Sequence, residues 1–317
     1  MIWNELRDII DSNQTFVISS HVSLDGDSIG SQLAFYWYLT SIGKTVHIFT
    51  HDPVPVKFGF LENAGMIKQE KPSCGFDVLV VLDCSNPHRL GWDEYKECAK
   101  LIVDIDHHRD NTRFGNINII DTKAAATGEI IYRFFTECGI DYPAFVAESL
   151  YMAIMSDTGG FRFSNTGSSV LRACAELSER GAQCSTIYDR VYSSRSRNAL
   201  ILQSKIWSTL KYYCNDRVSV MEMPLSLLDE LGAHYSDSEG MADHTITAEG
   251  IKVGIMAKYS PQETHFSLRS RGAVDVGKVA QQIPGGGGHS GAAGCTVALP
   301  YDQALKHILS IIEKELD

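Results

Sequence analysis

The chain has 317 residues, of which 44% are hydrophobic and 21% charged, and its formal net charge is −11. This length and composition are ordinary for a globular protein of two domains, and 39 acidic against 28 basic residues argue against the basic face that binds long DNA or RNA. The longest apolar runs, such as VLVVL at 78–82, are too short to cross a bilayer, and the N-terminus lacks the basic start of a signal peptide. We therefore expect a cytoplasmic protein without a membrane partner.

The first half of the chain alternates short apolar runs with helical patterns. Strands are predicted where β-branched residues dominate short runs, at 16–20, 45–50, 77–83, 101–106 and 117–121. Residues 27–43 predict a helix, with Asp27 as its candidate N-cap and Gly43 at its end. Strands separated by helices predict an α/β domain over 1–188, built on a parallel sheet with helices on both faces.

The second half predicts a helical region followed by a smaller domain. Apolar residues recur at helix spacing in 127–139, 144–157, 168–181 and 196–213, and the last of these predicts a helical linker over 189–212. Strands at 217–223, 251–260 and 264–270, a glycine-rich turn at 285–294 and a closing helix at 301–316 predict a smaller α/β domain over 213–317. The eight cysteines are scattered without a C-x-x-C pair, which predicts reduced, packed thiols.

Titratable residues follow three of the predicted strands and end one predicted helix. They are His21, Asp25 and Asp27, then Asp83, then Asp106, His107 and His108, and finally Asp157. A single aspartate at a strand end is usually a turn or cap residue. Because ligands bind at the carboxyl ends of strands in open α/β sheets, the recurrence of such groups at equivalent positions predicts one shared site.

The predicted site needs positive charge. Four aspartates in one partly dry crevice would repel one another unless cations neutralise them. Two divalent cations would do so, with His21 and His107 as neutral imidazole ligands. A carboxylate and histidine set without thiolates fits Mn²⁺ best among common metals, with zinc or iron as alternatives and Mg²⁺ less suited to two histidines.

Four segments together resemble a known family. HVSLDGDSIGS (21–31), VVLDCS (80–85), DHH (106–108) and SDTGG (156–160), in this order, resemble the motifs of the DHH phosphoesterase superfamily. SLRSRG (267–272) and PGGGGHSGAAG (284–294) resemble its DHHA1 substrate-binding domain. The resemblance covers nearly the whole chain, and the layout is most similar to the bifunctional oligoribonucleases that also dephosphorylate 3′-phosphoadenosine 5′-phosphate. Ser23-Leu24 departs from the Asn-Pro that relatives often carry.

The resemblance implies a two-metal hydrolase. One Mn²⁺ would be held by His21, Asp25 and Asp83, and the other by Asp27, Asp83, His107 and Asp157, with Asp83 as a bridge. Asp106 would orient a ligating histidine, and His108 would face the scissile phosphate or the leaving oxygen. The two cations would activate a shared water for in-line attack on phosphorus.

The second domain supplies candidate substrate-binding groups. Consecutive glycines leave backbone N–H groups open to a phosphate or a base. Arg269 and Arg271 alternate along one predicted strand, so we expect them on the same face, where arginine suits bidentate phosphate recognition. The candidates are Arg269, Arg271, Gly286, Gly287, Gly288 and His289.

These features predict degradation of short oligoribonucleotides to mononucleotides, and removal of the 3′-phosphate of 3′-phosphoadenosine 5′-phosphate. The alternative enzyme is a phosphodiesterase for cyclic or linear dinucleotides such as cyclic di-AMP or pApA, with identical catalytic motifs. The non-enzyme alternative is a nucleotide-binding sensor module, which predicts missing ligands. Short RNA or small nucleotide phosphoesters are the expected partners, and a homodimer is left open.

Overall fold

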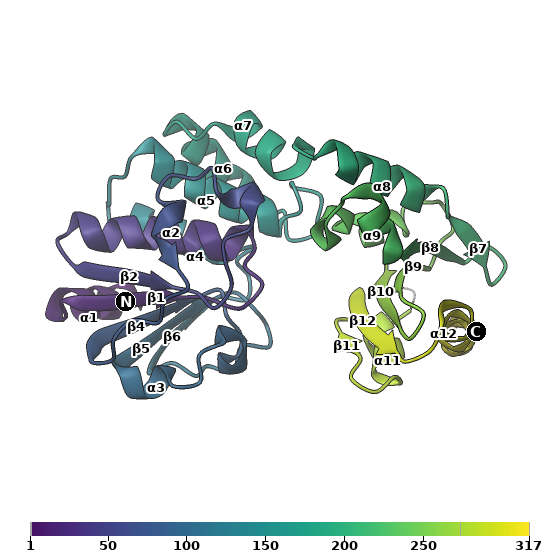
Figure 1. The fold of residues 1–317 in the computed structure, drawn as a ribbon. Helices are drawn as coiled ribbons and strands as arrows, with labels where there is room; N and C mark the ends of the chain where they lie inside the picture. The colour runs from purple at the N-terminus through teal and green to yellow at the C-terminus, as the bar shows by residue number, and fades with distance from the viewer. Residues whose placement is uncertain (1, 273, 317) are drawn as a thin grey trace. The chain divides into compact units, whose positions relative to one another are not determined.

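The computed structural model describes residues 2–272 and 274–316. The chain divides into two compact units, Met1–Ser194 and Arg195–Asp317, and each contains one six-stranded sheet in its described residues (Figure 1).

The sheet of the first unit is parallel throughout. Its order is β3-β2-β1-β4-β5-β6, with β1 at Thr15–Ser19, β2 at Thr45–Phe49, β3 at Ile67–Lys68, β4 at Phe76–Leu82, β5 at Ala99–Asp106 and β6 at Ile117–Ile120. The predicted parallel α/β fold is therefore confirmed, and only the two-residue strand β3 was not expected, since so short a run has no period to detect.

Both faces of this sheet are covered, and alternation along the strands decides which residue faces which core. Val78 and Val80 of β4 join the larger core, whereas Leu79 and Val81 join the smaller one. The larger core is formed with α1 (Ile2–Ser12), α2 (Gly26–Ser41), α4 (Thr127–Glu137), α5 (Ala144–Asp157), α6 (Ser168–Glu179) and α7 (Cys184–Tyr188). The smaller core packs under the turn Pro87–Leu90 and the short helix α3, Tyr95–Cys98.

The start of α2 corrects one prediction. Asp25, not Asp27, is the N-cap: its Oδ1 accepts from the Ser28 N–H at 2.9 Å, and the Ser28 hydroxyl oxygen accepts from the Asp25 N–H at 3.0 Å. This reciprocal pair is a capping box. Asp27 is fully buried instead, so its carboxylate is available to the interior rather than to the helix end.

The sheet of the second unit is mixed. Its order is β11-β12-β10-β9-β8-β7, formed by Lys211–Tyr213 (β7), Val218–Pro224 (β8), Val253–Tyr259 (β9), Thr264–Ser270 (β10), Gly287–Gly288 (β11) and Ala292–Val297 (β12). The helices are α8 (Arg197–Trp207), α9 (Ser226–Leu231), α10 (Met241–His244), α11 (Val276–Gln281) and α12 (Tyr301–Leu316). None of the helices in the described residues is long and apolar enough to cross a membrane.

Two expectations for individual segments are wrong. The helix predicted to 213 ends at Trp207, because residues 211–213 pair antiparallel with β8. Cys74 and Cys98 form a disulfide rather than remaining reduced, while the other six cysteines are free. The chain brings these two together where the Gly75 N–H donates to the Cys98 carbonyl at 2.9 Å, a contact that their separation of 24 residues does not reveal.

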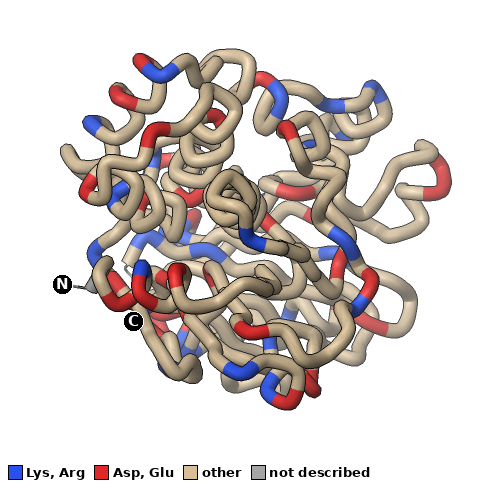
Figure 2. Tube along the Cα trace, turned by 90° about the vertical axis from the view of Figure 1, so that its left-hand side faces the viewer, with Lys and Arg blue, Asp and Glu red and all other residues tan. Residues whose placement is uncertain are grey.

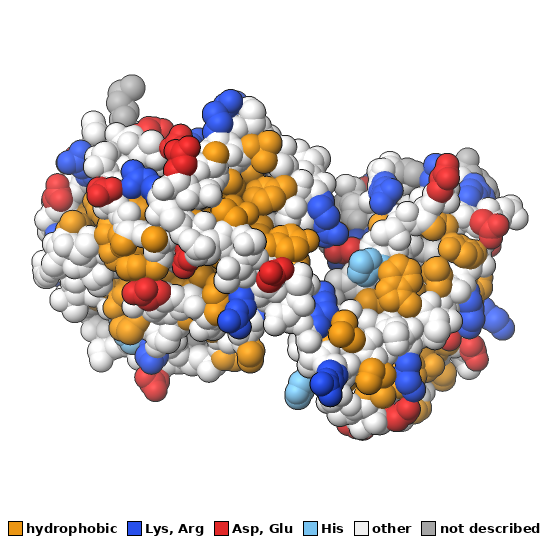
Figure 3. Space-filling view, turned by 90° about the horizontal axis from the view of Figure 1, so that it is seen from above, with side chains coloured by type: hydrophobic (Ala, Val, Ile, Leu, Met, Phe, Trp, Pro, Cys, Tyr) orange, Lys and Arg blue, Asp and Glu red, His pale blue; other side chains and the backbone are white. Residues whose placement is uncertain are grey.

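Charged residues are distributed over both units. In Figure 2, Lys and Arg positions lie among Asp and Glu positions along the trace. On the face shown in Figure 3, hydrophobic side chains also lie between charged ones of both signs. On the face shown in Figure 3, Lys and Arg side chains therefore do not form one continuous basic patch of the kind that binds long nucleic acid.

Candidate metal centre

Parallel pairing brings three polar strand ends to one edge of the sheet. Ser19 of β1 lies opposite Val81 of β4, and Leu82 of β4 lies opposite Ile105 of β5. The residues that follow these strands, His21, Asp83 and Asp106 with its two histidines, therefore emerge side by side.

A close helix contact brings the fourth cluster. A Cβ built on Gly30 of α2 would lie 2.2 Å from the Ser149 carbonyl oxygen of α5, and one on Gly128 of α4 would lie 2.5 Å from the Ala153 Cβ. Only glycine permits these approaches. As a result, Asp157, the last residue of α5, reaches the cluster at the start of α2.

The first group consists of His21, Asp25 and Asp83. Nε2 of His21 lies 3.6 Å from Asp25 Oδ2 and 3.4 Å from Asp83 Oδ2. The other ring nitrogen, Nδ1, bonds the carbonyl oxygen of Val22 at 2.6 Å. Since a carbonyl oxygen can only accept, Nδ1 carries the proton, and Nε2 faces the carboxylates as a metal ligand would.

The second group consists of Asp27, Asp83, His107 and Asp157. Nε2 of His107 lies 3.2 Å from Asp157 Oδ2, 3.6 Å from Asp83 Oδ1 and 3.8 Å from Asp27 Oδ2. This nitrogen is buried and has no hydrogen-bond partner among the described residues. A buried polar atom surrounded by oxygens at these distances fits a coordinated cation.

Asp83 is shared by the two groups. Its Oδ2 faces His21 and its Oδ1 faces His107. The residue is 1% exposed and has a φ of 58°, in the left-handed region that non-glycine residues rarely adopt. Strained backbone of this kind persists where surrounding structure holds it, and functional sites are common among such places.

The carboxylate of Asp27 lies at the N-terminus of α4. It accepts from the backbone N–H groups of Thr127 at 2.6 Å and Gly128 at 2.8 Å, and from the Ser31 hydroxyl at 2.9 Å. The helix terminus and these donors favour a carboxylate at a buried position. Sequence reasoning missed Thr127 and Gly128, although they begin a predicted helix.

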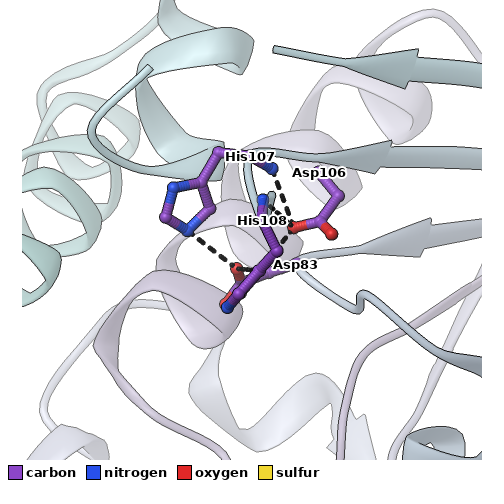
Figure 4. A group of neighbouring side chains, drawn as sticks. All are labelled: Asp83, Asp106, His107 and His108. Atoms are coloured by element: carbon purple, nitrogen blue, oxygen red, sulfur yellow. Dashed lines mark hydrogen bonds and ion pairs between the residues drawn. The ribbon is translucent and has the colours of Figure 1, made fainter. Parts of the chain in front are cut away.

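Asp106 binds the imidazole ring of His108. Its Oδ1 lies 2.7 Å from His108 Nδ1, and of His107 it accepts only the backbone N–H, at 2.8 Å. Figure 4 shows the Asp106 carboxylate beside the two histidines, with Asp83 close to both. The imidazole that Asp106 holds is therefore that of His108, while its contact with the predicted ligand His107 is to the backbone.

The clustered charges shift the proton affinities of the site. Burial lowers the pKa of His21, but the Asp25 and Asp83 carboxylates outweigh it and raise this pKa to about 10. Burial, together with the charges of Asp83 and Asp25, raises the pKa of Asp157 to about 8. Burial and the neighbouring carboxylates likewise raise the pKa of Asp27. The cluster therefore holds extra positive charge as protons, and divalent cations could replace them.

Ligand chemistry agrees with this geometry. The described residues contain three groups whose ligand atoms lie within 4.8 Å of one another: Asp83 with Asp106, His107 and His108; His21 with Asp25 and Asp83; and Asp27 with His107 and Asp157. The adjacent Cys84 is buried, which raises its thiol pKa to about 12 and disfavours a thiolate ligand. A carboxylate and imidazole set without thiolate suits Mn²⁺ and similar cations.

The candidate substrate-binding residues lie in the second unit. Arg269 points its Nε to Asp243 Oδ1 at 2.7 Å. Arg271 follows the end of β10, so strand alternation does not place it on the face of Arg269. Gly287 and Gly288 form β11 and pair with β12, where a Cβ on Gly288 would lie 2.5 Å from the Ala293 Cα. Gly287 and Gly288 of the glycine-rich segment therefore form a strand and not an irregular loop.

Comparisons with known proteins agree with the fold and the site. The N-terminal domain of the DHH family matches residues 15–154, and the DHHA1 domain matches residues 215–317. The chain therefore belongs to the DHH family of hydrolytic enzymes, with a DHHA1 domain as its second part.

Individual relatives match over nearly their whole length. The bifunctional oligoribonuclease and PAP phosphatase NrnA of Thermus thermophilus is 31% identical over 94% of this chain and 89% of the relative. The protein of the same name from Bacillus subtilis is 26% identical over 95% of this chain and 94% of the relative. The crystal structure of an exopolyphosphatase-related protein from Bacteroides fragilis superposes with a TM-score of 0.92 at 25% identity, covering 99% of this chain and 96% of that one.

Proposed function

We propose that this chain is a divalent-metal-dependent phosphoesterase that degrades short oligoribonucleotides to mononucleotides and removes the 3′-phosphate of 3′-phosphoadenosine 5′-phosphate. The observation that carries the proposal is the division of the Asp83 oxygens between two ligand groups, Oδ2 toward His21 and Oδ1 toward His107. The activities for which the Thermus and Bacillus relatives are named support the substrate class.

The two ligand groups would hold two cations, for which we propose Mn²⁺. One set is His21, Asp25 and Asp83, and the other is Asp27, Asp83, His107 and Asp157. Cations bound there would supply the positive charge that stabilises the phosphoryl oxygens and lowers the pKa of an attacking water. All the ligands that the sensor alternative predicts to be missing are present, which argues against it.

His108 would assist the leaving group. Burial lowers its pKa, but Asp106 and Asp83 outweigh burial and raise this pKa to about 9 in the metal-free protein, which favours the protonated ring. With Nδ1 held by Asp106, the Nε2–H can be donated. In the proposed step a water oxygen bonds to phosphorus and the bond from phosphorus to the ribose oxygen breaks. That oxygen takes the proton from His108, the attacking water releases one proton to solvent, and His108 regains a proton from solvent.

The second unit would recognise the substrate. Arg269, Arg271, His289 and the backbone at 286–288 offer groups that bind phosphates or approach bases closely. The 39 acidic residues outnumber the 28 basic ones, which gives a net charge of −11. Short substrates therefore suit this chain better than long RNA.

The decisive experiment is a panel of substrates with added Mn²⁺. We expect hydrolysis of the dinucleotide pApA, of RNA of five nucleotides and of 3′-phosphoadenosine 5′-phosphate. The turnover of RNA should fall as its length rises to tens of nucleotides. Asp83→Ala should abolish turnover, because among the described residues only Asp83 lies close to the ring nitrogens of both His21 and His107. The Asp8→Asn variant, at an exposed position, serves as the control.

Two results would overturn the proposal. Hydrolysis of none of these substrates by protein that binds Mn²⁺ would refute the activity. A marked preference for cyclic di-AMP would reassign the substrate to the cyclic dinucleotides.

A further inference from the structure

A layer of polar groups lies behind the pair formed by His108 and Asp106. Nδ2 of Asn111 lies 2.7 Å from Asp106 Oδ2 and 3.0 Å from Asp104 Oδ2. The amide thus reaches the Asp106 oxygen that does not contact His108, whose Nδ1 bonds Oδ1. The proposed hydrolysis uses neither Asn111 nor Asp104 directly.

The orientation of the Asn111 amide follows from its other contacts. The backbone N–H of Arg113 donates to Asn111 Oδ1 at 2.6 Å, so this oxygen faces a donor and the NH₂ group faces the two carboxyls. The NH₂ group also lies 3.3 Å from the Cys84 carbonyl oxygen. A flipped amide would place its oxygen against three acceptors. Arg113 adopts a φ of 53° at this turn, in the left-handed region.

Asp104 supports the amide from inside the sheet. This residue of β5 is fully buried, and its Oδ1 has no hydrogen-bond partner among the described residues. A Cβ on Gly115 would lie 3.0 Å from the Asp104 Cβ, so the neighbouring turn packs directly against it. Asn111 therefore donates to the Oδ2 oxygen of Asp104, and this contact restricts where the Asn111 side chain can point.

We propose that Asn111, supported by Asp104, is a positioning residue that fixes the Asp106 carboxylate and, through it, the His108 ring at the leaving oxygen. The proposal rests on the proposed phosphoester hydrolysis. Asp106 Oδ1 already accepts from the His107 and His108 N–H groups at 2.8 and 3.3 Å. Asn111 anchors the second oxygen and so stops the carboxylate from rotating away from His108.

The test exploits the different proton demands of two leaving groups. A dinucleotide releases a ribose hydroxyl, which needs a proton, whereas a p-nitrophenyl ester of a nucleoside monophosphate releases an anion that does not. We expect Asn111→Ala to lower kcat for the dinucleotide by about 10- to 100-fold and kcat for the p-nitrophenyl ester by less than about 3-fold. KM for both substrates should stay near the wild-type value.

Two further variants separate positioning from folding. Asn111→Asp keeps the size of the side chain but replaces the donor with an acceptor, so it should lose dinucleotide turnover at least as strongly as Asn111→Ala. Asn116→Ala is the matched control, because Asn116 Oδ1 accepts from the Ile102 N–H of the same strand at 2.8 Å without touching Asp106. It should change the two rates by the same factor.

The outcomes distinguish the two proposals. If wild-type protein hydrolyses neither substrate, the proposed function fails. If wild-type protein hydrolyses both and the Asn111 variants lose both rates equally, or lose neither, the hydrolase stands and the positioning role is refuted.

Discussion

Gly30 of α2 lies against the Ser149 carbonyl of α5 so closely that an added Cβ would sit 2.2 Å from this oxygen. The contact sets the distance between the helix that carries Asp27 and the helix that ends at Asp157. Since that carbonyl belongs to a helix backbone, it cannot move aside without moving α5.

Gly30→Ala should therefore move the ligands of the candidate metal centre apart, although Gly30 is not itself a ligand. We expect a destabilisation of about 1–3 kcal/mol from overpacking and a weaker Mn²⁺ affinity, because Asp157 moves away from His107. Chemical denaturation and calorimetric titration with Mn²⁺ measure the two effects. Gly65→Ala is the control, since a Cβ there meets no atom within 4 Å. Unchanged stability and affinity in Gly30→Ala would show that α5 adapts without affecting the site.

Ser23 offers a test of strain in the loop that carries His21 and Asp25. Its φ is 62°, and its N–H donates to Asp52 Oδ2. Asparagine tolerates this left-handed conformation better than serine, so Ser23→Asn should raise the free energy of unfolding by about 0.5 kcal/mol. Ser23→Val, with a β-branched side chain, should lower it by more than about 1 kcal/mol. Denaturant titrations measure the free energy of unfolding of both variants. If both values equal that of the wild type, the loop relaxes and Ser23 is not strained.

The stability of the metal-free protein should depend on pH in a specific direction. The pKa values of His21 and His108 are raised to about 10 and 9, above the usual 6.5. Between pH 6.5 and about pH 10, the folded state then binds more protons than the unfolded state. The stabilisation is complete below pH 6.5 and is lost as pH rises through 9 to 10. Asp157, with a pKa raised to about 8, acts in the same direction.

Thermal unfolding in the presence of EDTA measures this dependence. We expect Tm to fall by about 3 °C or more between pH 6.5 and pH 8.5, and Mn²⁺ to raise Tm most at the higher pH. A Tm that stays constant or rises over this interval would show that the His21 and His108 protons are not retained in the folded protein.

Arg269 is predicted to act on substrate binding rather than on the chemical step. Because charged hydrogen bonds to phosphate are strong, Arg269→Ala should raise KM for a dinucleotide by about 10-fold or more. Hydrolysis of a generic aryl phosphodiester should change much less. Asp243→Ala serves as the control: it removes the ion pair at 2.7 Å but leaves the guanidinium in place. Equal losses on both substrates in Arg269→Ala would argue against a dedicated recognition role.

Local pattern was sufficient to predict the parallel sheet and the order in which polar groups leave it. Apolar runs of five to eight residues mark strands by themselves, and the carboxyl ends of parallel strands share one edge. The candidates His21, Asp83 and His107 therefore followed from the sequence, and the structure places His21 Nε2 3.4 Å and His107 Nε2 3.6 Å from oxygens of the Asp83 carboxylate.

Contacts between distant segments had to be seen in the folded chain. Residues 27 and 127 are a hundred positions apart, yet the Asp27 carboxylate accepts the Thr127 N–H. Three further features depend on such contacts: the pairing of Asp106 with the His108 ring, the Cys74–Cys98 disulfide and the strand at 211–213. The periodicity of a sequence indicates which face of a helix or strand a residue occupies. Which partner that face meets depends on packing distances, and here glycines at helix contacts decide those distances.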